Sequence, residues 1–271
     1  MDELSINTFL KNISSELFIS YNSSEKEKIE TSLNYLIENI YSYFDDTVID
    51  INVFGSYTRG TTLPRKYDEN SDIDILIIFN TDNYDVKPET YRNQLRKFAL
   101  EYYSKSEIIK SFPSVILELN HIKFDLVAAI EKDHWIFNKK VIHIPRKGNN
   151  WIKTYPNEFN KKLTNSNVEY DSIVKPIIRL LKYWNASHKY PYESFVLEQL
   201  IADMNFAGGN YETGFFYAIE ELRIFGLELS EESKKTINTL KDQAKMLRVC
   251  LKKGIEKRCN FLLNKILPNL I

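Results

Sequence analysis

Residues 23–44 carry apolar side chains at intervals of three and four, which is the period of one face of a helix. These apolar positions are Ile29, Leu33, Leu36, Ile37, Ile40 and Phe44. Ser24 and Glu27 have the Ser-x-x-Glu spacing of a capping box, so we expect the helix to begin there. The next segment, residues 47–54, alternates apolar and polar side chains and is rich in β-branched residues, which predicts a strand.

The same patterns continue over the next eighty residues. The run "DIDILIIF" at 72–79 predicts a second, more deeply buried strand, and a helix is expected from residue 88 to about residue 105. Residues 114–130 resemble a hairpin that turns at Asn120 and His121. Strands that alternate with helices in this way predict an α/β arrangement for the N-terminal half of the chain.

From residue 168 onward the pattern is almost purely helical. Amphipathic helices are predicted at 172–184, 192–204, 214–226 and 230–254. Residues 143–160 contain Pro, Gly and Asn and are interpreted as a connection. We therefore expect two domains: residues 1–156, with the strands, and residues 157–271, all helical.

Composition narrows the class of protein. The chain has 271 residues, 43% of them hydrophobic and 13% aromatic, which predicts a globular protein and excludes a disordered one. The net charge of −1 provides no global basic field for tight, non-specific nucleic-acid binding. No apolar run approaches the roughly 20 residues that span a bilayer, and the start "MDELSINTFL" does not resemble a signal peptide, so a cytoplasmic location with no membrane partner is expected. Cys250 and Cys259 lack a zinc-ligand spacing and are expected to be free thiols.

Candidate chemistry begins with Asp72 and Asp74. Side chains alternate along a strand, so these two carboxylates project from one face. Like charges this close repel each other unless solvent, a basic group or a metal ion lies between them. Magnesium takes a few carboxylate oxygens and completes its shell with water and phosphate, so the pair predicts a magnesium site. A solvated strand end is the alternative.

Two other features accompany the carboxylates. Gly55 and Ser56 directly follow a predicted strand, where backbone N–H groups and a hydroxyl can hold a phosphate; an ordinary turn is the alternative. Asp125 lies in an otherwise apolar strand and needs a partner there, catalytic or structural. Arg59 and Arg65, in the loop between Ser56 and Asp72, are candidates for phosphate contacts or for surface charges.

Together these motifs resemble those of the nucleotidyltransferase (polymerase β-like) superfamily. Fifteen residues separate Ser56 from Asp72, close to the usual loop of that superfamily. The stretches "GSYTRGTTL", "HIPRKGNNWIKTYPNEF", "VKPIIRLLKYWN" and "YESFVLEQLI" are similar to motifs of the SMODS-type CD-NTases, bacterial relatives of the animal oligoadenylate synthases. One departure is Val127-Ala128-Ala129, where that group usually has Val-Pro-Ala.

This resemblance implies an α+β fold: a mixed sheet with flanking helices, a C-terminal all-helical domain, and an active site in the cleft between them. It implies that Asp72, Asp74 and Asp125 hold two magnesium ions, or manganese in their place, with Asp74 bridging both. Gly55 and Ser56 would hold the β- and γ-phosphates. Lys182 and Ser194 would clamp the triphosphate from the helical domain, although Ser194 is also placed to begin a helix.

The activity implied is synthesis of a cyclic or linear oligonucleotide second messenger from NTPs, ATP among them, in bacterial antiphage (CBASS-type) defence. A downstream effector would bind the product. One alternative is nucleotidyl transfer to tRNA, a protein or a small molecule. The near-neutral net charge argues against an RNA acceptor. Another is a nucleotide-binding module without catalysis. Base specificity, product size, linkage, trigger and oligomeric state do not follow from the sequence.

Overall fold

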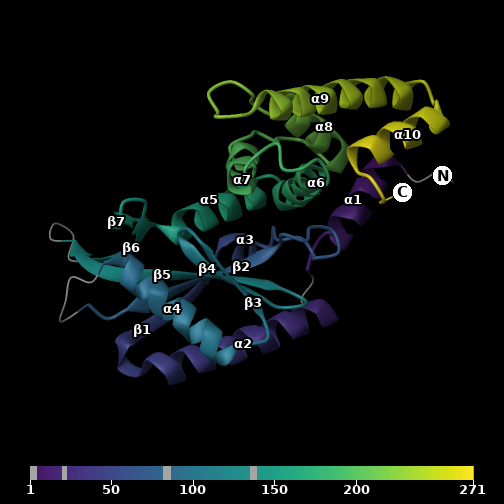
Figure 1. Cartoon of the computed structure of the whole chain (residues 1–271). Helices are drawn as coiled ribbons and strands as arrows, with labels where there is room; N and C mark the ends of the chain where they lie inside the picture. Colours follow the sequence, from purple (N-terminus) through teal and green to yellow (C-terminus); the bar gives the residue numbers. More distant parts are fainter. Residues whose placement is uncertain (1–4, 20–22, 82–86, 135–138, 271) are drawn as a thin grey trace. The chain divides into compact units, whose positions relative to one another are not determined.

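A computed structural model of the protein describes residues 5–19, 23–81, 87–134 and 139–270 (Figure 1). Its chain divides into two compact units, which we call the sheet unit and the helical unit. The sheet unit lies within residues 20–59 and 70–160, and the helical unit within residues 1–19, 60–69 and 161–271. The domain boundary expected at residue 156 stays a prediction; the units differ from it in that two N-terminal segments belong to the helical unit.

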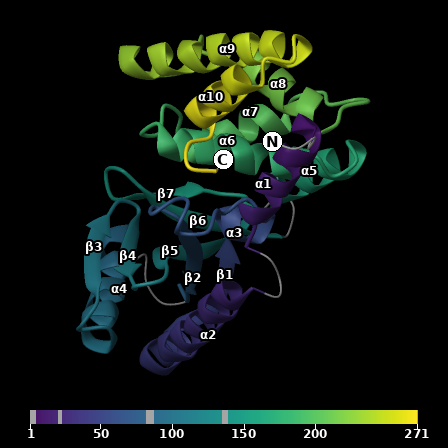
Figure 2. The same ribbon diagram turned by 90° about the vertical axis from the view of Figure 1, so that its right-hand side faces the viewer.

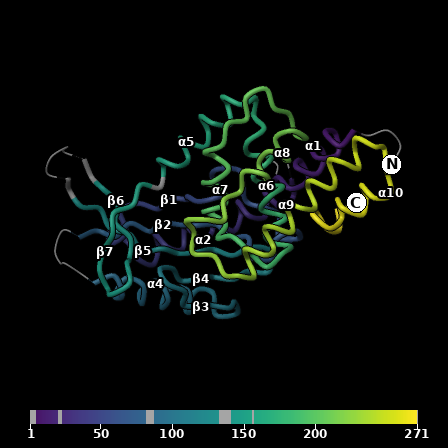
Figure 3. Tube along the Cα trace, turned by 90° about the horizontal axis from the view of Figure 1, so that it is seen from above, coloured from purple at the N-terminus to yellow at the C-terminus, as the bar shows by residue number. Residues whose placement is uncertain are grey.

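The sheet unit is built on seven strands in the order β1-β2-β5-β4-β3, with β6 beside β5 and β7 beside β6 (Figure 3). Only β2 and β5 pair in parallel among the described pairs; the others are antiparallel. The strands are β1 (Val48–Phe54), β2 (Asp72–Phe79), β3 (Glu107–Ser111), β4 (Ser114–Glu118), β5 (Lys123–His134), β6 (Lys139–Arg146) and β7 (Asn150–Lys153).

The helices α2 (Ser24–Phe44) and α4 (Pro88–Tyr102) pack on one face of this sheet (Figure 1). The Phe79 ring of β2 lies 5.2 Å from the Phe44 ring of α2 and 4.5 Å from the Tyr91 ring of α4. Because side chains alternate, the odd-numbered residues of β2 face these helices and the even-numbered ones face the opposite side. That opposite face carries its own buried apolar cluster, formed by Leu76, Ile78, Val127 and Ala129.

Most predicted elements of this unit are confirmed. The strand at 72–79 has the predicted bounds, and the helix expected from residue 88 ends at Tyr102. The predicted hairpin is formed by β4 and β5, with the Leu119 backbone N–H donating to the Ile122 carbonyl at 2.8 Å. The predicted N-cap is displaced by one residue: Ser23, not Ser24, accepts a hydrogen bond from the backbone N–H of Lys26.

The interpretation of residues 143–160 as a plain connection is wrong. This segment contains the second half of β6, all of β7 and the first residues of α5 (Pro156–Glu169). A local turn explains the difference: Lys147, Gly148 and Asn149 join the two strands, and φ is positive at Gly148 (89°) and Asn149 (60°). Gly and Asn tolerate this left-handed backbone, so the same residues that suggested a loop close a hairpin.

The helical unit contains the four predicted C-terminal helices, although the one expected at 214–226 ends at Glu221. It comprises α1 (Ile6–Glu16), α6 (Val174–Ser187), α7 (Ser194–Ala202), α8 (Tyr211–Glu221), α9 (Glu231–Lys252) and α10 (Glu256–Ile266), together with the later part of α5. Figure 2 shows α1 beside α6 and α8, although α1 comes from the start of the chain. The expected α+β class, with a mixed sheet and a C-terminal helical region, is therefore confirmed.

Two further expectations concern this part of the chain. Cys250 and Cys259 are buried free thiols in α9 and α10, which agrees with the prediction. None of the helices that the structure describes combines the length and apolar character needed to cross a membrane.

Candidate active site

The three predicted carboxylates lie on one face of two neighbouring strands. Asp72 and Asp74 are the first and third residues of β2, and Asp74 is the register partner of Asp125 in the parallel strand β5. Both strands therefore present their carboxylates near their N-terminal ends, on the face opposite α2 and α4. All three side chains are half-buried, beside the apolar cluster that continues along the same face.

Gly55 brings the backbone unusually close to Asp74. It begins the short helix α3 (Gly55–Arg59) directly after β1, whose last residue, Phe54, pairs with Asp74. The φ angle of Gly55 is 76°, and a Cβ atom at this position would lie 1.8 Å from the Asp74 Oδ2 atom. Both the backbone conformation and the lack of space therefore require glycine here. Ser56, the next residue, is half-buried in the first turn of α3.

Helix α3 is held in place by the start of α5. The Thr58 hydroxyl donates to the Gly55 carbonyl at 3.0 Å and accepts from the Asn160 side-chain amide at 3.3 Å. Arg59 donates to the Asn160 Oδ1 atom at 3.3 Å, and its guanidinium lies 5.2 Å from the centre of the Phe159 ring. Arg59 is only 7% exposed, so these contacts, rather than a surface position, fix α3 beside the carboxylates.

Asn160 and Phe159 were not predicted as parts of the site because only the tertiary fold brings them to α3. Arg65, the second candidate from the loop, belongs to the helical unit and donates from Nη2 to the backbone carbonyl of Glu69 at 3.0 Å.

Asp125 has the partner that its apolar surroundings require. The buried Ser114 hydroxyl donates to the Asp125 Oδ2 atom at 3.1 Å. Burial raises the pKa of the Asp125 carboxyl above its ordinary value, while the Ser114 hydrogen bond and the nearby Lys123 charge act in the opposite direction. Ser114 was not predicted as a site residue, although the hairpin that places it beside Asp125 was.

The carboxylates have the donor chemistry that magnesium prefers, three carboxyl groups on one face. In the part of the chain that the structure describes, however, no three His, Cys, Asp or Glu side chains gather closely enough to hold one metal ion. A cation there would also favour the charged form of Asp125, which burial disfavours. The metal-binding role of Asp72, Asp74 and Asp125 stays a prediction.

Lys182 and Ser194 both lie in the helical unit. Lys182 is only 7% exposed, and its Nζ atom forms an ion pair with the Glu198 Oε1 atom at 3.0 Å. The Thr61 hydroxyl donates to the same carboxylate oxygen at 2.9 Å. Ser194 is the first residue of α7 and is half-buried. Contact of Lys182 and Ser194 with a triphosphate stays a prediction, and Glu198 is a partner that the sequence analysis did not name.

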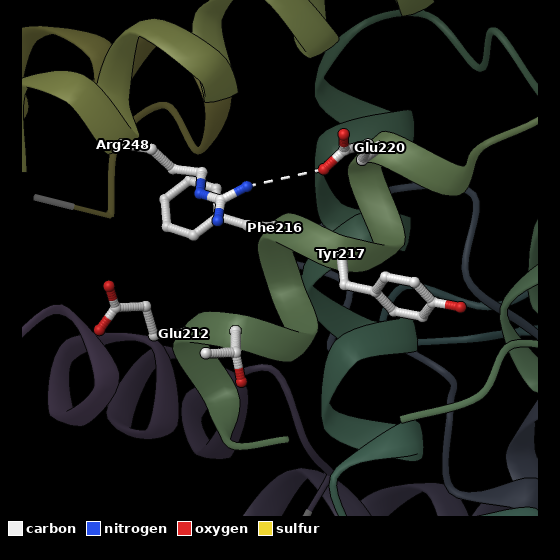
Figure 4. Close-up of a pocket in the computed structure, with 6 residues that line it drawn as sticks. Glu212, Phe216, Tyr217, Glu220 and Arg248 are labelled. Atoms are coloured by element: carbon white, nitrogen blue, oxygen red, sulfur yellow. Dashed lines mark ion pairs between the residues drawn. The ribbon is translucent and has the colours of Figure 1, made fainter. Parts of the chain in front are cut away.

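A cavity of about 190 Å³ lies elsewhere in the helical unit, between α8 and α9 (Figure 4). Its lining includes Phe216 and the exposed pair Arg248–Glu220, which are 3.6 Å apart. The guanidinium of Arg248 also lies 5.7 Å from the centre of the Phe216 ring. None of the predicted site residues lines this cavity.

Comparison with known families decides the assignment. The model of the Second Messenger Oligonucleotide or Dinucleotide Synthetase (SMODS) domain matches residues 4–167, more than half of the chain. The chain belongs to the SMODS family. The match covers Gly55, Ser56 and the three carboxylates, and it confirms the resemblance to the SMODS-type CD-NTases.

Individual relatives agree with this assignment. The chain is 32% identical over 103 residues to the "Probable cyclic nucleotide synthase" of Bacillus cereus (strain VD146), covering 37% of this chain and 31% of that protein. It is 26% identical over 193 residues to the "Cyclic AMP-AMP-AMP synthase" of Acinetobacter sp. (strain ATCC 27244 / 9458), covering 68% and 54%. The matches thus span about a third and about half of these curated relatives.

The SMODS fold is also seen in a solved structure. The CD-NTase CdnG of Bradyrhizobium diazoefficiens, in complex with GTP, superposes with a TM-score of 0.72 at 13% identity, over 98% of this chain and 96% of that one. At this level of identity the similarity establishes the fold.

Proposed function

We propose that this SMODS protein is a metal-dependent nucleotidyltransferase that joins NTPs into a cyclic or linear oligonucleotide second messenger. The observation that supports this most directly is the alignment of Asp74 with Asp125 on adjacent parallel strands, with Asp72 on the same face and Gly55 against Asp74. Three carboxylates beside a glycine-first helix suit phosphoryl transfer, which depends on positioning and charge neutralisation.

Asp72, Asp74 and Asp125 would hold magnesium ions, which supply charge neutralisation at the transferred phosphoryl group and lower the pKa of the attacking hydroxyl. Ser56 would donate its hydroxyl to a phosphate oxygen, and the backbone N–H groups at the start of α3 would add further donors. Ser114 orients the Asp125 carboxylate by donating to it. The contacts of α3 with Asn160 and Phe159 keep these donors at a fixed position relative to Asp74.

The second-messenger product is proposed from the relatives. One is a cyclic AMP-AMP-AMP synthase and another a probable cyclic nucleotide synthase, and the structure of CdnG contains GTP. NTPs, with ATP among them, are therefore the proposed substrates. A downstream effector that binds the product and a role in antiphage defence belong to the same proposal.

Incubation of the purified protein with all four NTPs and magnesium tests this proposal, with products separated from protein and analysed by mass spectrometry. We expect pyrophosphate together with nucleotide products that resist phosphatase. A parallel reaction adds labelled NTP to tRNA, to a cell-extract protein fraction and to small metabolites. More label in one of these acceptors than in soluble nucleotide product would favour nucleotidyl transfer to that acceptor. The absence of any product under all conditions, including with manganese, would contradict the proposal.

A further inference from the structure

Another cavity, this one in the sheet unit, lies at the first turn of α4, on the side of the sheet away from the carboxylates. It has a volume of about 510 Å³ and is lined by Pro88, Glu89, Arg92, Phe112, Lys147, Gly148 and Asn149. These residues come from three separate segments: the start of α4, the turn between β3 and β4, and the turn between β6 and β7. Its volume is in the range of small-molecule sites.

The walls of this cavity are joined by specific contacts. The backbone N–H of Glu89 donates to the Asn149 Oδ1 atom at 3.0 Å, so the β6–β7 turn caps the N-terminal end of α4. The residue that precedes the helix, Lys87, provides no side-chain cap of its own. The position of the turn relative to the helix is therefore fixed, and with it the width of the cavity.

Arg92 is the central charged group in the wall. It is 5% exposed, its Nη1 atom lies 2.7 Å from the Glu89 Oε2 atom, and its guanidinium lies 5.0 Å from the centre of the Phe112 ring. Its Nε–H group has no hydrogen-bond partner among the described residues. The guanidinium group of Arg92 therefore keeps unused hydrogen-bonding capacity, and its positive charge in the cavity wall favours an anionic ligand.

The charge around the cavity is predominantly positive. Glu89 is shared by two cations, because it forms ion pairs with both Arg92 and Lys110. Lys147 is an exposed third cation on the turn and has no ion pair within the described ranges. Three cations with one carboxylate leave an excess of positive charge, which favours an anionic ligand.

The cavity also offers a surface for a flat ring. Phe112 is 43% exposed, which is high for an aromatic side chain that lines a cavity, and Pro88 adds a second apolar wall. Aromatic side chains stack with nucleobases regardless of the base, and guanidinium and ammonium groups bind phosphate. We propose that this cavity is a binding site for a nucleoside monophosphate, with its phosphate on Arg92 and Lys147 and its base against Phe112. This inference does not depend on the proposed catalytic activity.

Binding of AMP, GMP, CMP and UMP to the full chain, measured by isothermal titration calorimetry with EDTA and no NTP, tests the site without catalysis. The variants Lys147→Ala and Phe112→Ala change exposed residues and are expected to fold. Each should weaken binding about tenfold. The control Lys153→Ala removes an exposed lysine from the same hairpin and should leave binding unchanged. Arg92→Gln, checked for folding by circular dichroism, should abolish binding.

Adenosine and inorganic phosphate, used as separate probes, show how much the base and the phosphate each contribute to binding. Each should bind more weakly than AMP, adenosine with a dependence on Phe112 and phosphate with a dependence on Lys147. Phosphate that binds as tightly as AMP would contradict the nucleotide class of ligand. No binding of any nucleotide at millimolar concentration, or binding that Lys147→Ala and Phe112→Ala leave unchanged, would overturn the proposal.

Discussion

The backbone at Gly55 lies against the carboxylate of Asp74, so that a Cβ atom at position 55 would be 1.8 Å from the Asp74 Oδ2 atom. Gly55→Ala should therefore displace either α3 or Asp74. A non-glycine residue at positive φ costs about 1–2 kcal/mol of stability. Misplacement of the site by about 1 Å should lower the rate of NTP conversion about 100-fold. Urea denaturation and product formation measure the two effects.

Gly226→Ala is the matched control for this change. Gly226 has nearly the same φ, 78°, but no heavy atom lies within 4 Å of its added Cβ. It should lose stability through backbone strain alone and keep its activity. Equal losses of activity in the two variants would show that the contact between position 55 and Asp74 is not important for function.

Ser114→Ala should raise the pKa of Asp125 further. Burial already raises this pKa, and the Ser114 hydrogen bond lowers it. Because the pKa of Asp125 is higher in the folded than in the unfolded protein, the protonated carboxyl stabilises the folded state. This contribution is fully present below the unfolded pKa and is lost as pH rises through the folded pKa. In Ser114→Ala this loss should extend to higher pH. NMR titration of the Asp125 carboxyl in metal-free protein measures the shift, with Ser111→Ala as a control that should leave it unchanged.

The ion pair between Lys182 and Glu198 predicts that substitutions of these two residues have strongly non-additive effects on stability. Because both groups are buried, Lys182→Met alone or Glu198→Leu alone leaves an uncompensated charge and should cost about 3–5 kcal/mol. The double variant should recover most of that stability. If Lys182 also contacts the triphosphate, the double variant should fold but have a raised KM for NTP. Single variants that cost less than about 1 kcal/mol would contradict the coupling.

Glu89 should make the protein lose stability as the pH becomes acidic. Its pKa is lowered, mainly by the Lys110 hydrogen bond and also by Arg92. A lowered carboxyl pKa contributes stability above the unfolded value, 4.5, that is lost as pH falls through the folded pKa. Glu89→Gln should lower stability at pH 7 and reduce its loss toward pH 4, as measured by urea denaturation. Glu101→Gln, an exposed change on the same helix, should match the unchanged protein at both pH values.

The sequence predicted those parts of the fold that depend on local pattern. The apolar run at 72–79 predicted the bounds of β2, and the strand period placed Asp72 and Asp74 on one face; Asp125 was singled out as a carboxylate in an otherwise apolar strand. The β6–β7 hairpin was missed because Gly148 and Asn149 are typical of both loops and tight turns. The predicted Ser24 cap was one residue off because Ser23, which is followed three residues later by Lys26 and not by a glutamate, caps the helix without a capping box.

The supporting contacts of the site required the tertiary fold. Asn160 is 101 residues from Arg59, and no local pattern links them. The same holds for Asn149, which caps α4 from a distant turn. Glu198 was part of a quoted motif, but its pairing with Lys182 depends on how α6 and α7 pack. The sequence therefore supplied the candidate site residues, while the residues that orient them were found only in three dimensions.

The central claim is that Asp72, Asp74 and Asp125 act as one metal-dependent unit. The most direct test compares NTP conversion by Asp72→Asn, Asp74→Asn, Asp125→Asn and the double variant Asp72→Asn/Asp74→Asn, with the exposed Asp46→Asn as control. Residues that act together lose function non-additively, so each single variant should fall to the level of the double variant while Asp46→Asn keeps full activity. Substantial product from folded Asp74→Asn protein would contradict the account.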